Sequence, residues 1–319
     1  MTKFMHVERT DVVLTLSTQK YNGRRFSFQI NSYSDDRRFK LLPSVARVLA
    51  IFDVNESFLS ILPVITKLFH LRYLQVRSLA KLPASISELQ NLQTLIQRAL
   101  LAFGFGNACH GQGPGSGRDK ILSSIPNLKI LIVQHDDLPK QSWVNCPIDM
   151  SSLTKLEALK CVSNAFLSWT PPISIKESFF PASLKRLTFT GWFGFPWEDI
   201  STLVKLPNLE ELKLKDRAAI GYVWRLRDDD IFESLKLLLF RKVLFTNWVA
   251  SSDNFPSLKH LGLKKCDNLK EIPIDFGEIC TLESIELLNC SPSAEDSARK
   301  SEQEQEDMGN NCLKVYIHT

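Results

Sequence analysis

The 319-residue sequence predicts an α/β repeat fold, in which successive short coils of chain each add one strand to a parallel sheet. A block with apolar residues at its first, fourth, seventh and ninth positions recurs about ten times, most clearly at 206–214, 232–240, 255–263 and 279–287. The final step of two residues is typical of a strand, because it places both side chains on one face. An amphipathic helix would continue with steps of three and four, so a helical bundle is the less favoured alternative.

The spacing of the blocks indicates which kind of repeat this is. The seventh positions of successive blocks are Leu49, Leu74, Leu95, Leu131, Leu159, Leu187, Leu212, Leu238, Leu261 and Ile285. Eight of the nine steps between them fall within the period of about 20–29 residues that is typical of leucine-rich repeats. Pro83 and Pro273 precede apolar residues in the return segments, where proline disfavours a central strand. We therefore expect a curved leucine-rich-repeat solenoid, a horseshoe with a parallel concave sheet and an irregular or short-helical outer arc.

The repeats divide the chain into four segments. Residues 1–43 are predicted to form an N-terminal capping segment that leads into the repeats, and residues 44–290 the repeats themselves. Residues 291–311 carry six acidic side chains and few large apolar ones, which indicates an acidic connector, either a solvated helix or a mobile segment. Residues 312–319 alternate in polarity, so we expect a closing strand that caps the sheet.

One step between repeats is much longer than the others and contains a glycine-rich irregular insert at 98–120. Glycine-rich chain can cradle a phosphate through its backbone N–H groups, but it also forms flexible surface loops. Lys120 is not followed by Ser or Thr, as a phosphate loop requires, so a surface loop is favoured. We hypothesise a deletion with a foreign or mis-spliced insert here. Gln97 also replaces the expected apolar residue, which predicts a frayed strand in this repeat.

The composition excludes several functional classes. Apolar residues make up 44% of the sequence and charged residues 23%, which is ordinary for a soluble protein. A net charge of +4 is too small for a protein that coats nucleic acid. Charges interrupt the first residues where a secretion signal needs an apolar core, and no later stretch of about 18 uncharged apolar residues occurs. We expect no membrane span and a cytoplasmic location, with nuclear shuttling or peripheral membrane association as alternatives.

The cysteines and histidines do not form a recognisable catalytic or metal-binding pattern. The seven cysteines lack a Cys-x-x-Cys pair and are expected to be reduced thiols. Asn164, Cys266 and Cys290 each follow the last apolar position of a block by three residues, where this repeat class uses Asn or Cys to hydrogen-bond turn backbone. The six histidines share no ligand spacing, and no nucleophile pattern is present. We expect no enzyme and no metal or cofactor in this chain.

The amino-acid sequences of several repeats resemble those of a known family. The segment Phe255-Pro-Ser-Leu-Lys-His-Leu-Gly-Leu263 with its continuation to Pro273, and residues 206–214 and 285–290, resemble the leucine-rich-repeat region of plant intracellular NLR immune receptors. The similarity is greatest to the coiled-coil class that includes the late blight resistance proteins, and it extends to residues 24–28, 45–52 and 302–317. It implies a non-catalytic recognition module in plant defence, which senses pathogen effectors and regulates a nucleotide-binding switch linked to the hypersensitive response.

The resemblance also implies which partners and cofactors to expect. The protein partners would be a pathogen effector or a guarded host protein, together with the nucleotide-binding domain of the parent receptor. ADP or ATP would bind only in that domain, whose phosphate loop Gly-x-x-x-x-Gly-Lys-Ser/Thr is missing here. We therefore expect a receptor region without its switch domain. A free-standing leucine-rich-repeat scaffold or substrate-recruiting adaptor is the alternative.

The concave face of the predicted sheet is the candidate partner-binding surface. Its positions hold eight basic and two acidic side chains, which fits either a basic cradle for an acidic protein or a solvated lysine-rich face. Apolar residues at some positions indicate either a contact patch or packing under a covering loop. Nucleic acid is disfavoured, since stacking aromatic residues are scarce there. The candidate residues are Tyr73, Arg77, Ile130, Ile132, Lys160, Arg186, Lys213, Lys215, Leu237, Leu239, Arg241, His260 and Lys264.

Overall fold

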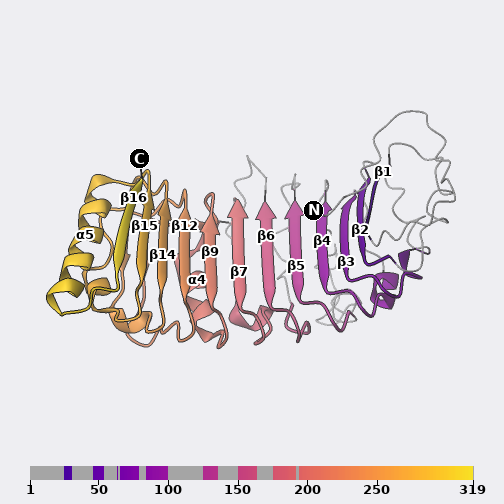
Figure 1. Cartoon of the computed structure of the whole chain (residues 1–319), viewed down its shortest axis with the longest axis horizontal. Helices are drawn as coiled ribbons and strands as arrows, with labels where there is room; N and C mark the ends of the chain where they lie inside the picture. The colour runs from indigo at the N-terminus through magenta and orange to yellow at the C-terminus, as the bar shows by residue number, and fades with distance from the viewer. Residues whose placement is uncertain are drawn as a thin grey trace, which may run out of the picture. The chain divides into compact units, whose positions relative to one another are not determined.

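The computed structural model describes residues 25–30, 46–53, 63, 65–78, 84–99, 125–135, 150–163, 175–191 and 194–318. They fall into two compact units, one comprising Met1–Ser142 and Ser152–Leu156 and the other comprising Trp143–Ser151 and Glu157–Thr319. Each unit is built from parallel strands that follow one another in sequence order (Figure 1).

The first unit contains five parallel strands. They are β1 (Arg25–Ile30), β2 (Val48–Asp53), β3 (Tyr73–Ser78), β4 (Thr94–Ala99) and β5 (Ile130–His135). Their register aligns the predicted repeat positions, since Leu49 pairs with Leu74, Leu74 with Leu95 and Leu95 with Leu131. A short 3-10 helix, η1 (Ala84–Glu88), occupies the return segment between β3 and β4. Strand β1 precedes the first predicted repeat and lies in the segment that was expected to cap the repeats.

The prediction of a frayed strand at Gln97 is wrong. Gln97 pairs with Val76 on one side and Val133 on the other, and only 3% of it is exposed. Strand β4 has the same six-residue length as its neighbours. A parallel ladder is made by backbone groups, so one polar side chain at an inward position does not interrupt it. Beyond residue 99, the glycine-rich insert lies outside the described residues.

Among the described residues, seven strands of the second unit form its main parallel sheet. They are β6 (Ala158–Ser163), β7 (Arg186–Gly191), β9 (Glu211–Lys215), β12 (Leu237–Arg241), β14 (His260–Lys264), β15 (Ser284–Leu288) and β16 (Lys314–His318). The regular buried and half-buried alternation in β9, β12 and β15 places the repeat leucines inward. The predicted leucine-rich-repeat solenoid with a parallel sheet is confirmed.

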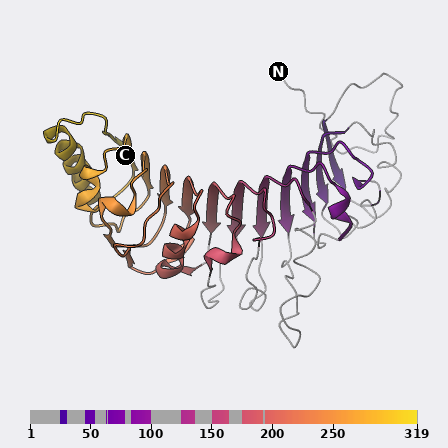
Figure 2. The same ribbon diagram turned by 90° about the horizontal axis from the view of Figure 1, so that it is seen from below.

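Short elements form the return segments of the second unit, away from the strand layer (Figure 2). The helical ones are η3 (Glu177–Phe179), α4 (Trp197–Ser201), η4 (Thr202–Lys205), η5 (Ser252–Asn254), η6 (Ile274–Glu278) and α5 (Pro292–Asp307). Two small parallel sheets complete them, one pairing β8 (Phe195–Pro196) with β10 (Ala219–Ile220), the other β11 (Val223–Arg225) with β13 (Asn247–Val249).

Left-handed turns end several strands of the second unit and connect each coil to the next. Lys242 and Lys265 have φ of 52° and 56°, a conformation that turns the chain sharply after the strand. Their backbone N–H groups donate to the carbonyl oxygens of Lys264 and Leu288 at 2.9 and 2.7 Å. Asp216 makes the same bond to the Arg241 carbonyl at 2.7 Å. The coils of β9, β12 and β14 are thus each hydrogen-bonded to the next coil at the end of the strand.

A second set of bonds joins coils through side chains that precede the second leucine of a repeat. These side chains donate to a carbonyl of the preceding coil, and they belong to Asn91, Asn127, Asn208, Ser234 and Thr281. The donor-to-acceptor distances range from 2.7 Å for Asn91 to 3.2 Å for Thr281. The signal is visible in the sequence as Asn, Ser or Thr before that leucine, although the repeat analysis did not use it.

A row of aromatic rings fills the core of the second unit. Trp197, Trp224 and Trp248 come from successive coils and stack at centroid distances of 5.1 and 5.3 Å. Phe276 continues the row at 4.9 Å from Trp248. The Trp224 indole N–H donates to the Ser201 hydroxyl at 3.2 Å, so the buried polar edge of the ring has a partner.

The C-terminal segment forms a helix and a last strand. Ser291 caps α5 by accepting the Ala294 N–H at 3.2 Å, and Pro292 occupies the first helical turn, where it is compatible with helix. The buried side of α5 consists of small and polar residues, including Ala298 and Gln305. The Gln305 amide donates to the Ile279 carbonyl at 2.8 Å, so the acidic segment packs on the repeats without large apolar side chains. After the helix, the chain forms strand β16, which pairs with β15.

Candidate partner-binding face

The parallel register of the second unit arranges the face of the sheet away from the core, here called the open face, into three rows. The first row, near the strand starts, is Ala158, Arg186, Glu211, Leu237, His260, Ser284 and Lys314. The middle row is Lys160, Thr188, Lys213, Leu239, Gly262, Glu286 and Tyr316. The last row is Val162, Thr190, Lys215, Arg241, Lys264, Leu288 and His318. Nine candidate residues therefore share one face.

Four of these candidates gather on β6, β9 and β12 as a basic cluster, defined as Lys160, Lys213, Lys215 and Arg241. Lys213 pairs with Glu211 at 2.7 Å, and Arg241 forms an ion pair with Asp216. Within the described residues, Lys160 and Lys215 make no ion pair with a carboxylate. Burial lowers the pKa of Lys215, and the neighbouring charges of Arg241, Lys160 and Lys213 lower it further, while the Asp216 carboxylate raises it. The cluster therefore keeps an excess of positive charge.

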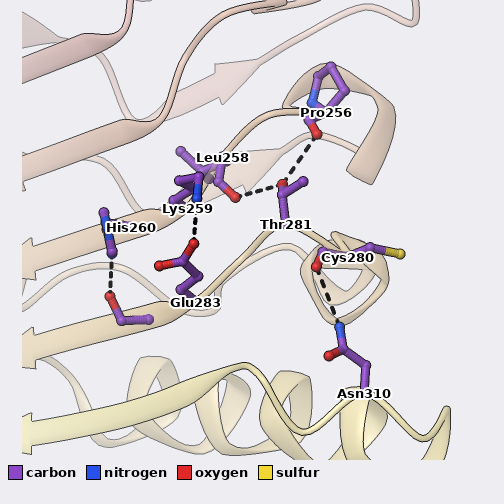
Figure 3. A network of polar contacts seen from close by, with 9 residues as sticks. Pro256, Leu258, Lys259, His260, Cys280, Thr281, Glu283 and Asn310 are labelled. Atoms are coloured by element: carbon purple, nitrogen blue, oxygen red, sulfur yellow. Dashed lines mark hydrogen bonds and ion pairs between the residues drawn. The ribbon is translucent and has the colours of Figure 1, made fainter.

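The charges on β14 and β15 are mostly neutralised. Lys264 pairs with Glu286 at 3.0 Å on the open face. At the strand starts, Lys259 pairs with Glu283 at 2.5 Å, and the hydrogen bond from Lys259 lowers the pKa of Glu283 (Figure 3). His260 Nδ1 lies 2.9 Å from the Ser284 hydroxyl. The positive excess is therefore concentrated on β6 to β12 instead of being spread evenly along the sheet.

The same close-up shows how the coils are joined beside these ion pairs. The Thr281 hydroxyl bridges the carbonyl oxygens of Leu258 and Pro256 at 2.8 and 3.2 Å (Figure 3). The Asn310 amide donates to the Cys280 carbonyl at 3.4 Å. These side chains connect coils, so their role is structural.

Leu237 and Leu239 form an apolar patch beside the basic cluster. Both are half-buried, and strand β12 keeps a regular alternation with Leu238 and Phe240 buried. Leu239 lies between Lys213 and Gly262 in the middle row. A Cβ at Gly262 would sit 3.3 Å from the Leu239 side chain, so the glycine leaves room for it. Two neighbouring leucines beside a basic cluster offer an apolar contact for a partner.

The first unit holds three further candidates with described side chains. Ile130 and Ile132 are half-buried on β5, and Ile132 pairs with Ile96, which the sequence analysis did not select. The Tyr73 hydroxyl lies 2.9 Å from the Gln75 side-chain oxygen, and burial raises the pKa of Tyr73. The Arg77 side chain lies outside the described residues. The apolar character of this face comes from Ile96, Ile130 and Ile132 together.

The repeat cysteines with described side chains have structural partners. Cys266 Sγ donates to the Lys264 carbonyl at 3.7 Å, and Cys290 Sγ to the Leu263 carbonyl of the preceding coil at 3.2 Å. The contact between the two thiols raises the pKa of Cys266, as does burial, and the same contact lowers the pKa of Cys290. Asn164 lies outside the described residues. Among those described, no three His, Cys, Asp or Glu side chains cluster as metal ligands.

The repeat period, the parallel register and the turn geometry define a leucine-rich-repeat protein. No protein-family profile matches the chain. Among solved structures, an internalin from Listeria monocytogenes is 15% identical and covers 86% of this chain and 76% of its own, with a TM-score of 0.44. The leucine-rich repeat domain of the type III effector XopL is 18% identical and covers 79% of this chain and 70% of its own, with a TM-score of 0.35.

Sequence comparison shows which leucine-rich-repeat proteins this chain resembles. The putative late blight resistance protein homolog R1B-12 of Solanum demissum is 27% identical over 87% of this chain and 23% of its own length. Another putative late blight resistance protein homolog of the same plant is 33% identical over 62% of this chain and 24% of its own. The predicted resemblance is confirmed, since this leucine-rich-repeat chain is similar to these putative plant disease-resistance proteins over most of its length. It spans about a quarter of the length of the curated relatives it matches.

In the part of the chain that the structure describes, no helix has the length and apolar character needed to cross a membrane.

Proposed function

We propose that this chain is the non-catalytic recognition module of a plant immune receptor, and that its open face binds a protein partner. The observation that carries the proposal is the apolar patch of Leu237 and Leu239 beside the basic cluster. Two leucines beside a basic cluster suit a partner surface on which an apolar residue is surrounded by acidic ones. Complementary charge orients the partner during association, and burial of the apolar side chains stabilises the complex.

The homology extends the proposal to a biological role. The partners are the nucleotide-binding domain of the parent receptor, which the open face binds, and a pathogen effector or a guarded host protein. The module regulates a nucleotide-binding switch in the cytoplasm. ADP or ATP is held by the nucleotide-binding domain of the parent receptor, and this chain contributes recognition. The similarity to late blight resistance protein homologs supports this role.

A binding experiment with the switch domain tests the proposal. The chain would be co-expressed in leaf tissue with the nucleotide-binding domain of a late blight resistance protein homolog, and recovery measured by co-precipitation. The double variant Leu237→Glu, Leu239→Glu should reduce recovery at least tenfold, since each buried leucine contributes about 1.5–3 kcal/mol and 1.4 kcal/mol is a factor of ten.

The matched control is Tyr222→Glu, which adds a carboxylate at a side chain that is 75% exposed and outside the strands of the open face. It should leave recovery unchanged. Circular dichroism of each variant verifies that the repeats remain folded. Equal recovery of the double variant and the wild-type chain would remove the open face as the binding surface.

A further inference from the structure

Strand β7 presents two threonines to the open face between strands that carry lysines. Thr188 pairs in register with Lys160 of β6 and with Lys213 of β9, while Thr190 pairs with Lys215. Neighbouring strands lie about 4.8 Å apart, a distance that a lysine side chain spans. The space above β7 is therefore within reach of ammonium groups from both sides.

Arg241 extends this arrangement by one strand. It pairs in register with Lys215 and lies in the same row as Thr190. The carboxylates of Glu211 and Asp216 neutralise two of the four cations of the basic cluster. Lys160 and Lys215 form no ion pair among the described residues, although the Asp216 carboxylate offsets part of the positive charge around Lys215. Lys215 is partly withdrawn from water, and the crowding of cations around it lowers its pKa. A bound anion would relieve this repulsion.

Two buried polar atoms at the same place have no hydrogen-bond partner within the described residues. They are the Thr190 hydroxyl oxygen and Arg241 Nε, which lie in the same row on either side of Lys215. Buried donors are nearly always paired in folded proteins, because an unpaired donor loses its bonds to water without replacement. Both atoms lie beneath the surface of the open face with almost no exposed area, so an anion would reach them only after the Thr190 hydroxyl or the Arg241 side chain turned outward.

We propose that Lys160, Thr188, Thr190, Lys215 and Arg241 form a binding site for a phosphoryl group. Two lysines without an ion pair, beside a guanidinium group, favour a dianion. The hydroxyl, ammonium and guanidinium donors together also require more acceptor oxygens than the two of a carboxylate. The phosphoryl group comes from a phosphorylated side chain of a bound peptide or from a small phosphate compound. The site does not depend on the proposed receptor role, since phosphate binding is measurable without a protein partner.

Calorimetric titration of the whole chain tests the site with two probes: inorganic phosphate, and a short phosphoserine peptide compared with its unphosphorylated form. Wild-type chain should bind phosphate at millimolar concentration or below. Lys215→Met should raise the dissociation constant about tenfold or more, the usual effect of losing a hydrogen bond to a charged group. Thr190→Val keeps shape and charge, so an increase of similar size in that variant identifies a direct hydrogen bond.

The matched control is Lys236→Met, which removes one charge from an exposed lysine that pairs with Glu210 outside the basic cluster. It should change the dissociation constant less than twofold. Thr190→Val should fold as well as the wild type, because the hydroxyl has no partner among the described residues to lose.

The two probes distinguish the source of the phosphoryl group. A phosphopeptide that binds at least tenfold more tightly than both inorganic phosphate and the unphosphorylated peptide indicates a partner-borne group, and equal binding of phosphate and phosphopeptide indicates a small compound. Either result supports the site. Absence of phosphate and phosphopeptide binding in the wild-type chain, or equal weakening by Lys236→Met and Lys215→Met, would overturn the proposal. Loss of the receptor role would leave both measurements unaffected.

Discussion

Replacing Trp224 with alanine removes the central ring of the aromatic row in the second unit. Trp224 has no exposed surface and stacks between Trp197 and Trp248 at 5.1 and 5.3 Å. Its N–H donates to the Ser201 hydroxyl at 3.2 Å. The three tryptophans come from three coils, so this change removes contacts that join neighbouring coils as well as contacts inside one.

The expected loss in the free energy of unfolding is about 4–6 kcal/mol. Truncation of a buried Trp to alanine costs about 3–5 kcal/mol through lost burial and the cavity left behind. Each aromatic pair adds about 0.5–1.5 kcal/mol beyond its area, although part of this overlaps with the first figure. The lost hydrogen bond adds little, because the Ser201 hydroxyl still donates to the Trp197 carbonyl at 3.2 Å. Trp224→Phe keeps a ring in place and should cost about 1–2 kcal/mol.

Urea unfolding followed by circular dichroism measures these losses. Tyr222→Ala, at a neighbouring side chain that is 75% exposed, is the control and should stay within about 0.5 kcal/mol of the wild type. The near-ultraviolet signal of the stacked tryptophans should fall in Trp224→Ala and persist in Tyr222→Ala. A loss below about 2 kcal/mol for Trp224→Ala, at an unchanged dependence on urea, would refute the view that this row holds the coils together.

Two further changes test the backbone and the buried thiol. Gly191→Ala should cost about 3 kcal/mol or more, because Gly191 has φ of 101° and an added Cβ would lie 1.7 Å from the Ser163 carbonyl oxygen. Gly309→Ala, at φ of 83° with nothing within 4 Å, should cost only about 1 kcal/mol; similar melting temperatures for the two variants would contradict this account. Burial raises the pKa of Cys161 from its ordinary value near 9 to about 12, so its thiol ionises first in the unfolded chain. The stability that it contributes is complete below pH 9 and is lost as the pH rises towards 12, by about 1.4 kcal/mol per pH unit. Urea unfolding between pH 9 and 10.5 should show a shallower decline in Cys161→Ala, and equal slopes would exclude this contribution.

The strands and their inward residues follow from the sequence because both depend on local spacing. A step of two residues between Leu212 and Leu214 places both on one face of a strand, whatever lies beside them. Gln97 shows where this reasoning is limited, since its side chain is polar and yet its strand is complete. Backbone pairing with the strands on either side maintains β4, and neighbouring strands are not visible in a local pattern.

The return segments were less predictable. Helix α5 packs through Ala294, Ala298 and Ser301, and small residues give a weak hydrophobic signal. The aromatic row of Trp197, Trp224 and Trp248 lies outside the repeat positions, so only the stacking of coils brings its members together.

By itself, the sequence determined the repeat period, the residues that face the core and the candidates for the open face, because a solenoid repeats one local rule. Only the tertiary structure decided which of those charges act together. Asp216 adopts a left-handed conformation and forms an ion pair with Arg241 of the next coil, while Lys215, one residue earlier, forms no ion pair among the described residues. Ion pairing depends on the register between coils and on side-chain direction at turns, and neither is a property of one segment of chain.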